Sequence, residues 1–451
     1  MTVPRSLRGS ITRSLTCCSA LALAASCGAN AHLAVADGMG VSPQLPKPES
    51  SLIPTVNVAK AKAWTGNAKP IAASGLQVSA FARDLQHPRW IYVLPNGDVL
   101  VAETNAPKRP DDNKGFRGWV MGLFMKKSGG AAPSADRITL LRDTNGDGVA
   151  DVRSVLVDGL YAPFGMTMVN GYLYVANSDA LVRFTYDSTQ TRITSAPTKV
   201  IDLPAGTINH HWTKNVIASP DGKKLYVAIG SNSNAGEHGE ASEKDRARIW
   251  EVDIASGQHR DFATGLRNPV GMAWDETGQL WVAVNERDEI GGDLVPDYMT
   301  AVHDGAFYGF PYSYFGQHVD ERVKPKRPEL VAHAITPDFA LGAHTASLGL
   351  ASAVGSKLPA PFDHGMFIGQ HGSWNRKPRS GYKVIFEPFA NGKPSGAAID
   401  VLTGFVNDNG DAMGRPVGVA IDKKGALLVA DDVGNVIWRV TRASTAARMQ
   451  R

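Results

Sequence analysis

The chain has 451 residues, of which 43% are hydrophobic and 20% charged. This composition excludes a disordered, collagen-like or coiled-coil protein. Lys and Arg number 47 against 43 Asp and Glu, so the charge balance gives no indication of nucleic-acid binding. The 46 glycines and 27 prolines favour many turns between short strands, and the three cysteines all lie within the first 27 residues.

Residues 1–36 have the features of an export signal. Arg5, Arg8 and Arg13 precede an apolar run at 15–27, which is too short to span a bilayer but has the length of a signal-peptide core. Two small-residue cleavage sites follow, Ala29-Asn30-Ala31 and Ala34-Val35-Ala36. We therefore expect export, with a bacterial periplasm as the compartment, and a mature protein without cysteine.

Lipidation at Cys27 is an alternative outcome of export, because Ala24-Ala25-Ser26-Cys27 loosely resembles a bacterial lipoprotein box. The simpler interpretation is that Cys27 belongs to the signal peptide. Residues 37–75, rich in Pro, Ala and Lys, are predicted to form a tether or an irregular N-terminal arm.

A turn containing glycine, preceded and followed by short apolar segments, occurs six times in the chain. The copies read PNGDVLVAET (95–104), VNGYLYVANSD (169–179), PDGKKLYVAIGSN (220–232), ETGQLWVAVNE (276–286), DHGMFIGQHG (363–372) and KKGALLVADD (423–432). Two strands joined by such a turn form a hairpin. The turn glycines of successive copies are 51 to 87 residues apart. Hairpins repeated at such intervals predict an all-β fold, a six-bladed β-propeller over residues 76–445.

The insertion between the first two hairpins contains GFRGWVMGLFMKK (115–127), which mixes aromatic, Met and basic residues. Such a stretch can enter a membrane interface or dock on an electron acceptor. It can equally pack against the edge of the propeller.

The segment DTNGDGVAD resembles the first half of an EF-hand loop, with Asp143, Asn145, Asp147 and Asp151 at positions 1, 3, 5 and 9. Position 12 is Ser154 instead of Glu, and strand-like segments flank the loop. A structural calcium site and a plain hairpin turn are both compatible with this pattern.

Basic residues precede the first strand of several hairpins. Arg89, His211, Arg267, His344 and Arg415 occupy comparable positions in five of the six copies. Because the first strand of each blade lines the central channel, these side chains are expected to converge at its mouth. Converging cations are costly unless an anion joins them, and Arg is a bidentate partner for carboxylates. A polyanionic ligand is one explanation, and local salt bridges are the other.

Several segments resemble the soluble pyrroloquinoline quinone (PQQ) sugar dehydrogenases. They are HHWTKNVIASPDGKKLYVAIGSN (210–232), GLRNPVGMAWDETGQLWVAVNE (265–286), GGD (291–293) and AFYGFPYSYFG (306–316), in the order expected for that family. The resemblance covers about residues 76–442. Within this family, the sequence of the matched segments is most similar to the bacterial L-sorbosone dehydrogenases.

This resemblance implies a role for each matched residue. His211 would be the general base, while Arg267, Asn268 and Arg415 would bind PQQ. Arg89, His344 and the Trp374-Asn375-Arg376 stretch are further candidates. A calcium ion would be ligated by the backbone carbonyls of Asp288 and Glu289, although the usual Gly-Pro pair is replaced there. The family's substrate-side glutamine has no counterpart in 158–165, which suggests a substrate other than glucose.

The function expected from the resemblance is oxidation of an aldose or sugar aldehyde, such as L-sorbosone to 2-keto-L-gulonate. Electrons would pass to an external acceptor, a cytochrome or a quinone pool, since the chain has no C-x-x-C-H haem site. Two alternatives are a metal-dependent lactonase-type hydrolase and a non-catalytic binding propeller. The first needs carboxylates around a divalent ion, and the second leaves His211 and Arg267 unexplained.

Overall fold

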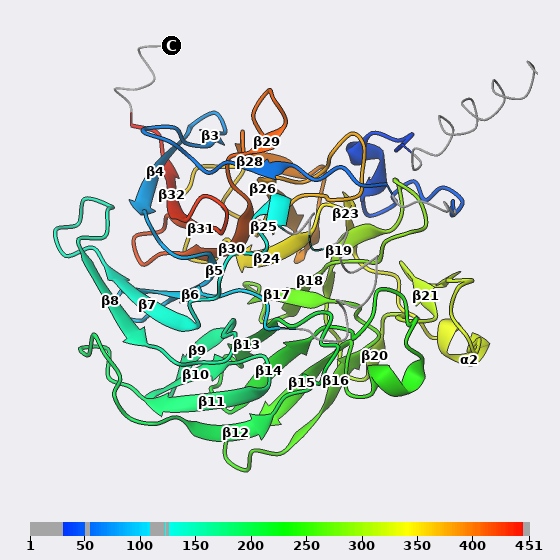
Figure 1. The fold of residues 1–451 in the computed structure, drawn as a ribbon, viewed down its shortest axis with the longest axis horizontal. Helices are drawn as coiled ribbons and strands as arrows, with labels where there is room; N and C mark the ends of the chain where they lie inside the picture. Colours follow the sequence, from blue (N-terminus) through cyan, green and yellow to red (C-terminus); the bar gives the residue numbers. More distant parts are fainter. Residues whose placement is uncertain (1–29, 50–54, 109–121, 123–125, 445–451) are drawn as a thin grey trace, which may run out of the picture.

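The computed structural model describes residues 30–49, 55–108, 122 and 126–444. In this part of the chain six sheets of mainly antiparallel strands surround a common axis (Figure 1). The innermost strands of neighbouring sheets contact one another around the whole ring. The prediction of an all-β, six-bladed propeller is confirmed.

The blades follow one another in chain order, and each sheet runs from the axis outward. Blade 1 contains β5 (Pro88–Val93), β6 (Val99–Glu103), β7 (Arg137–Arg142) and β8 (Val152–Val157). Blade 2 contains β9 (Met166–Val169), β10 (Tyr172–Ala176), β11 (Ala180–Thr185) and β12 (Thr198–Asp202). Blade 3 contains β13 (Lys214–Ala218), β14 (Lys224–Ile229), β15 (Arg248–Asp253), β16 (His259–Thr264) and β20 (Ala306–Phe307).

The other three blades include strands from the N-terminal part of the chain. Blade 4 contains β17 (Pro269–Trp274), β18 (Leu280–Val284), β19 (Pro296–Ala301), β23 (Phe339–Ala343) and β1 (Met39–Gly40). Blade 5 contains β24 (Ser347–Ser352), β25 (Gly365–Gln370), β26 (Lys383–Ala390), β28 (Ile399–Thr403) and β3 (Ile71–Ala72). Blade 6 contains β30 (Pro416–Ile421), β31 (Leu427–Asp431), β32 (Val436–Arg442) and β4 (Leu76–Ala82).

The remaining elements are short. They are the strand pairs β2 (Lys60–Ala61) with β29 (Asp411–Ala412) and β21 (Ser313–Tyr314) with β22 (His318–Val319), the edge strand β27 (Lys393–Pro394), the 3₁₀ turns η1 (Val35–Gly38) and η2 (Glu240–Glu243), and α2 (Pro328–Val331). None of the helices in the described ranges is long and apolar enough to cross a membrane.

Each of the six repeated segments forms the hairpin of the two innermost strands of one blade. The glycine in each turn has a φ between +68° and +144°. Few side chains tolerate this region, whereas glycine adopts it readily. The repeated glycine therefore has a local conformational cause, which explains why it marked the blades in the sequence.

The ring is closed by the N-terminal strand β4, which pairs antiparallel with β32 as the outermost strand of blade 6. The last blade is thus built from both ends of the propeller domain, and this ties the first blade to the last. The sequence did not predict this closure, because the repeated hairpins lie only on the inner side of each blade.

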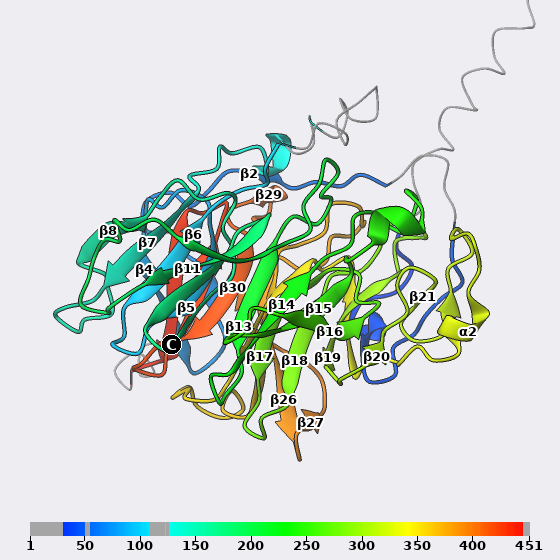
Figure 2. The same ribbon diagram turned by 90° about the horizontal axis from the view of Figure 1, so that it is seen from below.

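The described part of the N-terminal arm is irregular but docked on the propeller (Figure 2). It adds β1 to blade 4, pairs β2 with β29 and adds β3 to blade 5. The Trp64 indole also donates to the Asp431 carboxylate at 2.7 Å. Residues 1–29, with Cys27, and most of 115–127 lie outside the described residues, so the predictions for them stay predictions.

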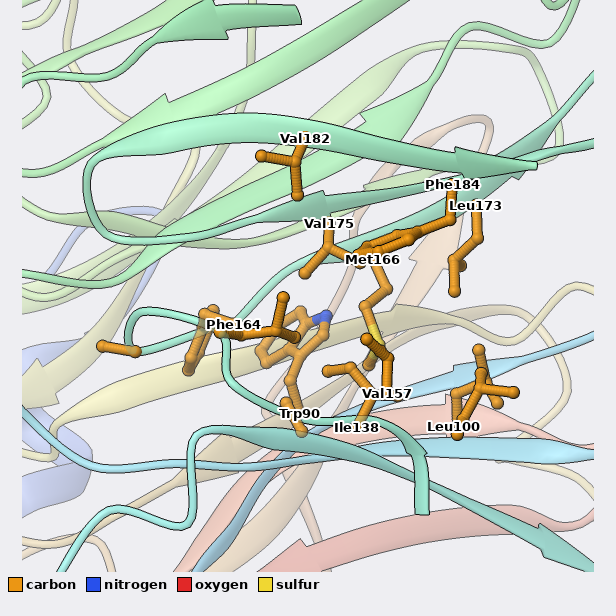
Figure 3. Close-up of a cluster of buried hydrophobic side chains, with 14 of the residues drawn as sticks. Trp90, Leu100, Ile138, Val157, Phe164, Met166, Leu173, Val175, Val182 and Phe184 are labelled. Carbon is orange, nitrogen blue, oxygen red and sulfur yellow. The ribbon is translucent and has the colours of Figure 1, made fainter. Parts of the chain in front are cut away.

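One buried apolar cluster contains side chains from all six blades. Trp90, Phe164, Trp212, Val270, Leu348 and Val417 belong to one buried cluster. Trp90 and Phe164 have ring centroids 4.7 Å apart and lie between blades 1 and 2 (Figure 3).

Glycines at the axis let neighbouring inner strands approach closely. A Cβ built on Gly349 of β24 would lie 2.1 Å from the Val417 carbonyl oxygen of β30. We therefore expect Gly349→Ala to cost about 1–3 kcal/mol of stability or more, seen as a lower melting temperature in thermal denaturation. The control is Gly38→Ala, whose Cβ would meet no atom within 4 Å. Equal stability of the two variants would contradict this packing argument.

Candidate active site at the channel mouth

The sequence-predicted residues lie at the end of the channel where the inner strands begin. Arg89 lies in β5. The other predicted residues lie within three residues before the starts of β13, β17, β24 and β30, and they are His211, Arg267, Asn268, His344 and Arg415. The β-sheet registers shift in the first residues of β5, β17, β24 and β30. Such bulges re-aim side chains at the rim of a barrel-like structure.

His211 is a half-buried histidine with one ring nitrogen hydrogen-bonded to Ser231. Its Nδ1 lies 3.0 Å from the Ser231 carbonyl oxygen, which can only accept, so Nδ1 carries the proton. Nε2 then holds a lone pair, and it has no hydrogen-bond partner among the described residues. Burial, followed by the charge of Arg267, holds the pKa of His211 well below its usual value.

Two buried cations fix the loop that carries His211. Arg246 Nη2 donates to the carbonyl oxygens of His211 at 3.0 Å and Ser231 at 3.2 Å. Lys214 Nζ donates to the Trp212 carbonyl at 3.1 Å and is fully buried. Burial lowers the pKa of Arg246 to about 10 and that of Lys214 well below its usual value. These residues hold the backbone on both sides of His211, and the sequence analysis did not identify them.

Arg267 is almost completely hydrogen-bonded within the protein. Its guanidinium donates to the carbonyl oxygens of Asn234, Asn285 and Glu286 at 2.7–3.0 Å and to Asn234 Oδ1 at 2.9 Å. A guanidinium has five N–H groups, so one remains for a ligand. Arg267 thus joins blades 3 and 4 structurally, and its predicted role in cofactor binding stays a prediction.

Asn268 lies beside His211, as predicted for residues that share one site. A Cβ on Gly230 would lie 2.4 Å from Asn268 Oδ1 and 2.5 Å from His211 Cβ. Asn268 Oδ1 is buried without a hydrogen-bond partner among the described residues. An unpartnered buried amide oxygen is costly, which is consistent with a ligand donor at this place.

Arg89 and Arg415 form a second group across the channel mouth. Arg89 Nη1 donates to Asp432 Oδ2 at 2.8 Å, so here the local salt bridge that the sequence left open does form. Arg415 donates to the Tyr382 hydroxyl at 2.8 Å and stacks on its ring at 4.9 Å. Both arginines have a buried Nε without a partner among the described residues. Burial lowers the pKa of Arg89, and the charge of Arg415 lowers it further.

Asp432 is the centre of this second group, and the sequence analysis missed it. His371 Nε2 lies 2.9 Å from Asp432 Oδ2, and His87 Nε2 lies 3.6 Å from the same oxygen. Burial disfavours the charged carboxylate, but His371, His87 and Arg89 together hold the pKa of Asp432 far below its usual range. The only sequence signal for it was its position at the end of the sixth repeat, ALLVADD.

His344 follows β23, and both of its ring nitrogens contact the loop after β18. Its Nδ1 lies 2.9 Å from Asp288 Oδ1, and its Nε2 lies 2.9 Å from the Gly291 carbonyl oxygen. Burial opposes the charged imidazole, but the Asp288 carboxylate more than offsets this and raises the pKa of His344. Both ring nitrogens of His344 are hydrogen-bonded to the loop after β18, and His344 therefore orders this loop. The geometry does not support direct contact of His344 with a cofactor.

The loop also does not fit the predicted calcium ion. The Asp288 carbonyl oxygen accepts a hydrogen bond from Arg322 Nη1 at 2.8 Å and one from Asn234 Nδ2 at 3.3 Å. A guanidinium therefore occupies the side of this carbonyl where a cation was expected. The adjacent Glu289 has a φ of +74°. Calcium at the carbonyls of Asp288 and Glu289 stays a prediction without structural support, and no catalytic step below uses it.

The EF-hand-like loop joins β7 and β8 as a self-capped turn. Asp143 accepts hydrogen bonds from the amides of Gly146 and Gly148 at 2.7 and 3.0 Å and from Lys424 Nζ at 2.7 Å. Asn145, Asp147 and Asp151 likewise accept hydrogen bonds from amides of the same loop. No group of three His, Cys, Asp or Glu side chains in the described ranges is arranged to hold a metal ion. The structure thus favours the plain turn.

Comparisons with known proteins identify relatives with the same architecture. The structure of the PQQ domain of pyranose dehydrogenase from Coprinopsis cinerea, in its holo form, superposes with a TM-score of 0.66 at 21% identity, over 85% of this chain and 100% of that one. The calcium structure of the family AA12 enzyme from Trichoderma reesei gives a TM-score of 0.67 at 18% identity, over 84% and 100%.

Sequence comparison gives a consistent result. The PQQ-dependent pyranose dehydrogenase of Coprinopsis cinerea is 24% identical over 438 residues, which cover 82% of this chain and 54% of that protein. The chain spans little more than half the length of the curated relatives it matches. The profile of the TrAA12-like family matches residues 136–312 and 324–443, more than half of the chain. The chain therefore belongs to the TrAA12-like family.

Proposed function

We propose that this protein is a PQQ-dependent dehydrogenase that oxidises a sugar or a sugar aldehyde. The observation that carries the proposal is the placement of His211, whose Nε2 has no partner among the described residues, beside Asn268 and within the field of Arg267. Arg89 and Arg415 lie at the same end of the inner strands. The names of the relatives support the cofactor, since two of them are PQQ-dependent pyranose dehydrogenase and its PQQ domain.

The polar atoms at the channel mouth fit a flat ligand with several carboxylates. Arg89 and Arg415 each have an unpaired buried Nε, and Arg267 has one N–H to spare. Charge-assisted hydrogen bonds to carboxylates are among the strongest in proteins. The buried apolar cluster that includes Trp212 and Val417 would cover one face of such a ligand.

Bound PQQ would supply the ortho-quinone that accepts hydride from the substrate carbon. The residues of this chain handle the proton. His211 Nε2 takes the proton of the substrate hydroxyl, or of one hydroxyl of a hydrated aldehyde, while Ser231 keeps Nδ1 protonated. Arg246 holds both carbonyl groups and so prevents the ring from turning away.

The finer parts of the proposal rest on the sequence resemblance. We propose L-sorbosone as the substrate and 2-keto-L-gulonate as the product, with electrons passing to a separate cytochrome or quinone pool. We further propose that the protein acts in the periplasm after export, in solution or at the membrane surface. A metal-dependent lactonase remains the alternative, but no observation on the described residues favours it.

Reconstitution tests this function. The protein is purified without PQQ, mixed with PQQ in the presence or absence of calcium, and assayed for dye reduction with L-sorbosone and D-glucose. We expect dye reduction that depends on PQQ and quinone absorbance that stays with the protein on gel filtration. No dye reduction together with no retained quinone would overturn the proposal, and lactone hydrolysis without PQQ would favour the alternative.

The pH dependence of the reaction gives an independent check on His211. The base acts when neutral, and burial followed by the charge of Arg267 lowers its pKa below the usual value near 6.5. We therefore expect kcat/KM to stay level from pH 8 down to about 6.5 and to fall only at more acidic pH. A loss of activity beginning above pH 6.5 would contradict the neutral, buried base.

A further inference from the structure

The Asp293 carboxylate holds the beginning of the N-terminal arm. Its Oδ2 accepts hydrogen bonds from the backbone nitrogens of His32 at 2.6 Å and Leu33 at 3.1 Å. Its Oδ1 lies 3.1 Å from Arg376 Nη2. The Asp293 side chain is only 8% exposed. A nearly buried carboxylate thus accepts from two successive backbone nitrogens, and the shorter of the two hydrogen bonds comes from His32.

The sequence places a cleavage motif directly before His32. The apolar run at 15–27 is followed by Ala29-Asn30-Ala31, and export peptidases cut after the second small residue of such a motif. A cut at that peptide bond turns the His32 amide into an α-ammonium group. The new charge would lie at the nitrogen that already contacts Asp293 Oδ2.

The second motif, Ala34-Val35-Ala36, fits the structure poorly. A cut after Ala36 would remove the two backbone N–H groups that donate hydrogen bonds to Asp293. It would also remove the Leu33 carbonyl oxygen, which accepts a hydrogen bond from Arg376 Nη2 at 2.7 Å. It would also divide η1, which packs against β23. Arg376 is 1% exposed, and leaving such buried polar groups without partners is costly.

We propose that the protein is processed between Ala31 and His32 and that Asp293 binds the α-ammonium group so formed. Asp293 follows Gly291 and Gly292, whose carbonyl oxygens accept hydrogen bonds from His344 and Arg376. The mature N-terminus is therefore fastened to the loop that borders the channel mouth. This inference concerns maturation and does not depend on the proposed catalytic activity.

Intact mass of the secreted protein tests the position of the cut. The full chain is expressed with its own leader in a Gram-negative bacterium, and the periplasmic protein is purified and analysed by mass spectrometry and N-terminal sequencing. We expect a chain that begins at His32. A chain that begins at Asp37, or one that keeps a lipidated Cys27, would overturn the proposal.

A double-mutant cycle tests the role of Asp293. The form that begins at His32 is compared with a cytoplasmic form that begins with Met followed by Asn30, each with and without Asp293→Asn. Because a charge-assisted hydrogen bond is stronger than a neutral one, we expect D293N to lower the melting temperature about 2 °C more in the His32 form. Equal losses of melting temperature on D293N in the two forms would overturn the proposal that Asp293 binds the ammonium group.

Two further measurements keep the cycle interpretable. Asp37→Asn changes an exposed carboxylate of the same arm and should affect both forms equally. If D293N does not fold, amine labelling of the unsubstituted forms replaces it. The α-amine of His32 should react about tenfold more slowly at neutral pH than that of the extended form, since Asp293 favours its protonated state. Equal labelling rates would again overturn the proposal.

Discussion

Replacing His211 by alanine is expected to lower kcat for sugar oxidation by a factor of about 10² to 10⁴, the usual contribution of a positioned general base. The affinity for PQQ should change little, because the cofactor-binding role is assigned to the arginines and to Asn268. The alanine variant should also lose the acidic limb of the pH profile. Steady-state dye reduction and equilibrium titration of the apo-protein with PQQ measure the two effects separately.

The matched control for this substitution is His333→Ala, which removes an exposed histidine after α2. Its activity should be unchanged. Full turnover by the His211→Ala variant would refute the assignment of the base. A parallel loss of PQQ binding and turnover would instead show that His211 is needed to maintain the PQQ-binding structure of the site.

The number and order of the blades could be predicted because their cause is local. Each inner hairpin needs a residue that adopts positive φ at its turn, and Gly97 and Gly425 are two of the six that supply it. The closure by β4 and the docking of the arm could not be predicted in this way. They depend on pairing between Val78 and Val440 and between Met39 and Leu341, residues that are distant in sequence.

The candidate site could be predicted only as a set of positions. The offset of basic residues from the repeated turn placed Arg89, His211 and Arg415 on one rim, since a blade repeats its geometry. What each side chain contacts depends on loops without a repeat. Asn234 accepts two of the four hydrogen bonds that the Arg267 guanidinium donates. Arg322 donates to the Asp288 carbonyl oxygen that was expected to bind calcium.

Replacing Arg415 by methionine is expected to weaken PQQ binding by about 10- to 100-fold, the value of one charge-assisted hydrogen bond at about 1.5–3 kcal/mol. Arg415 is a sharper test than Arg267. Removing Arg267 would leave the carbonyl groups of Asn234, Asn285 and Glu286 without their donor and would destabilise the fold.

Arg415 has no carboxylate partner among the described residues, and its guanidinium is oriented by the Tyr382 ring and hydroxyl. Methionine keeps the contact with this ring but provides neither charge nor donor. The melting temperature of the apo-protein should therefore change little, whereas the PQQ titration should shift. Arg192→Met, which changes an exposed arginine between β11 and β12, is the control and should bind PQQ normally. If Arg415→Met binds PQQ as tightly as this control, Arg415 does not bind the PQQ carboxylates.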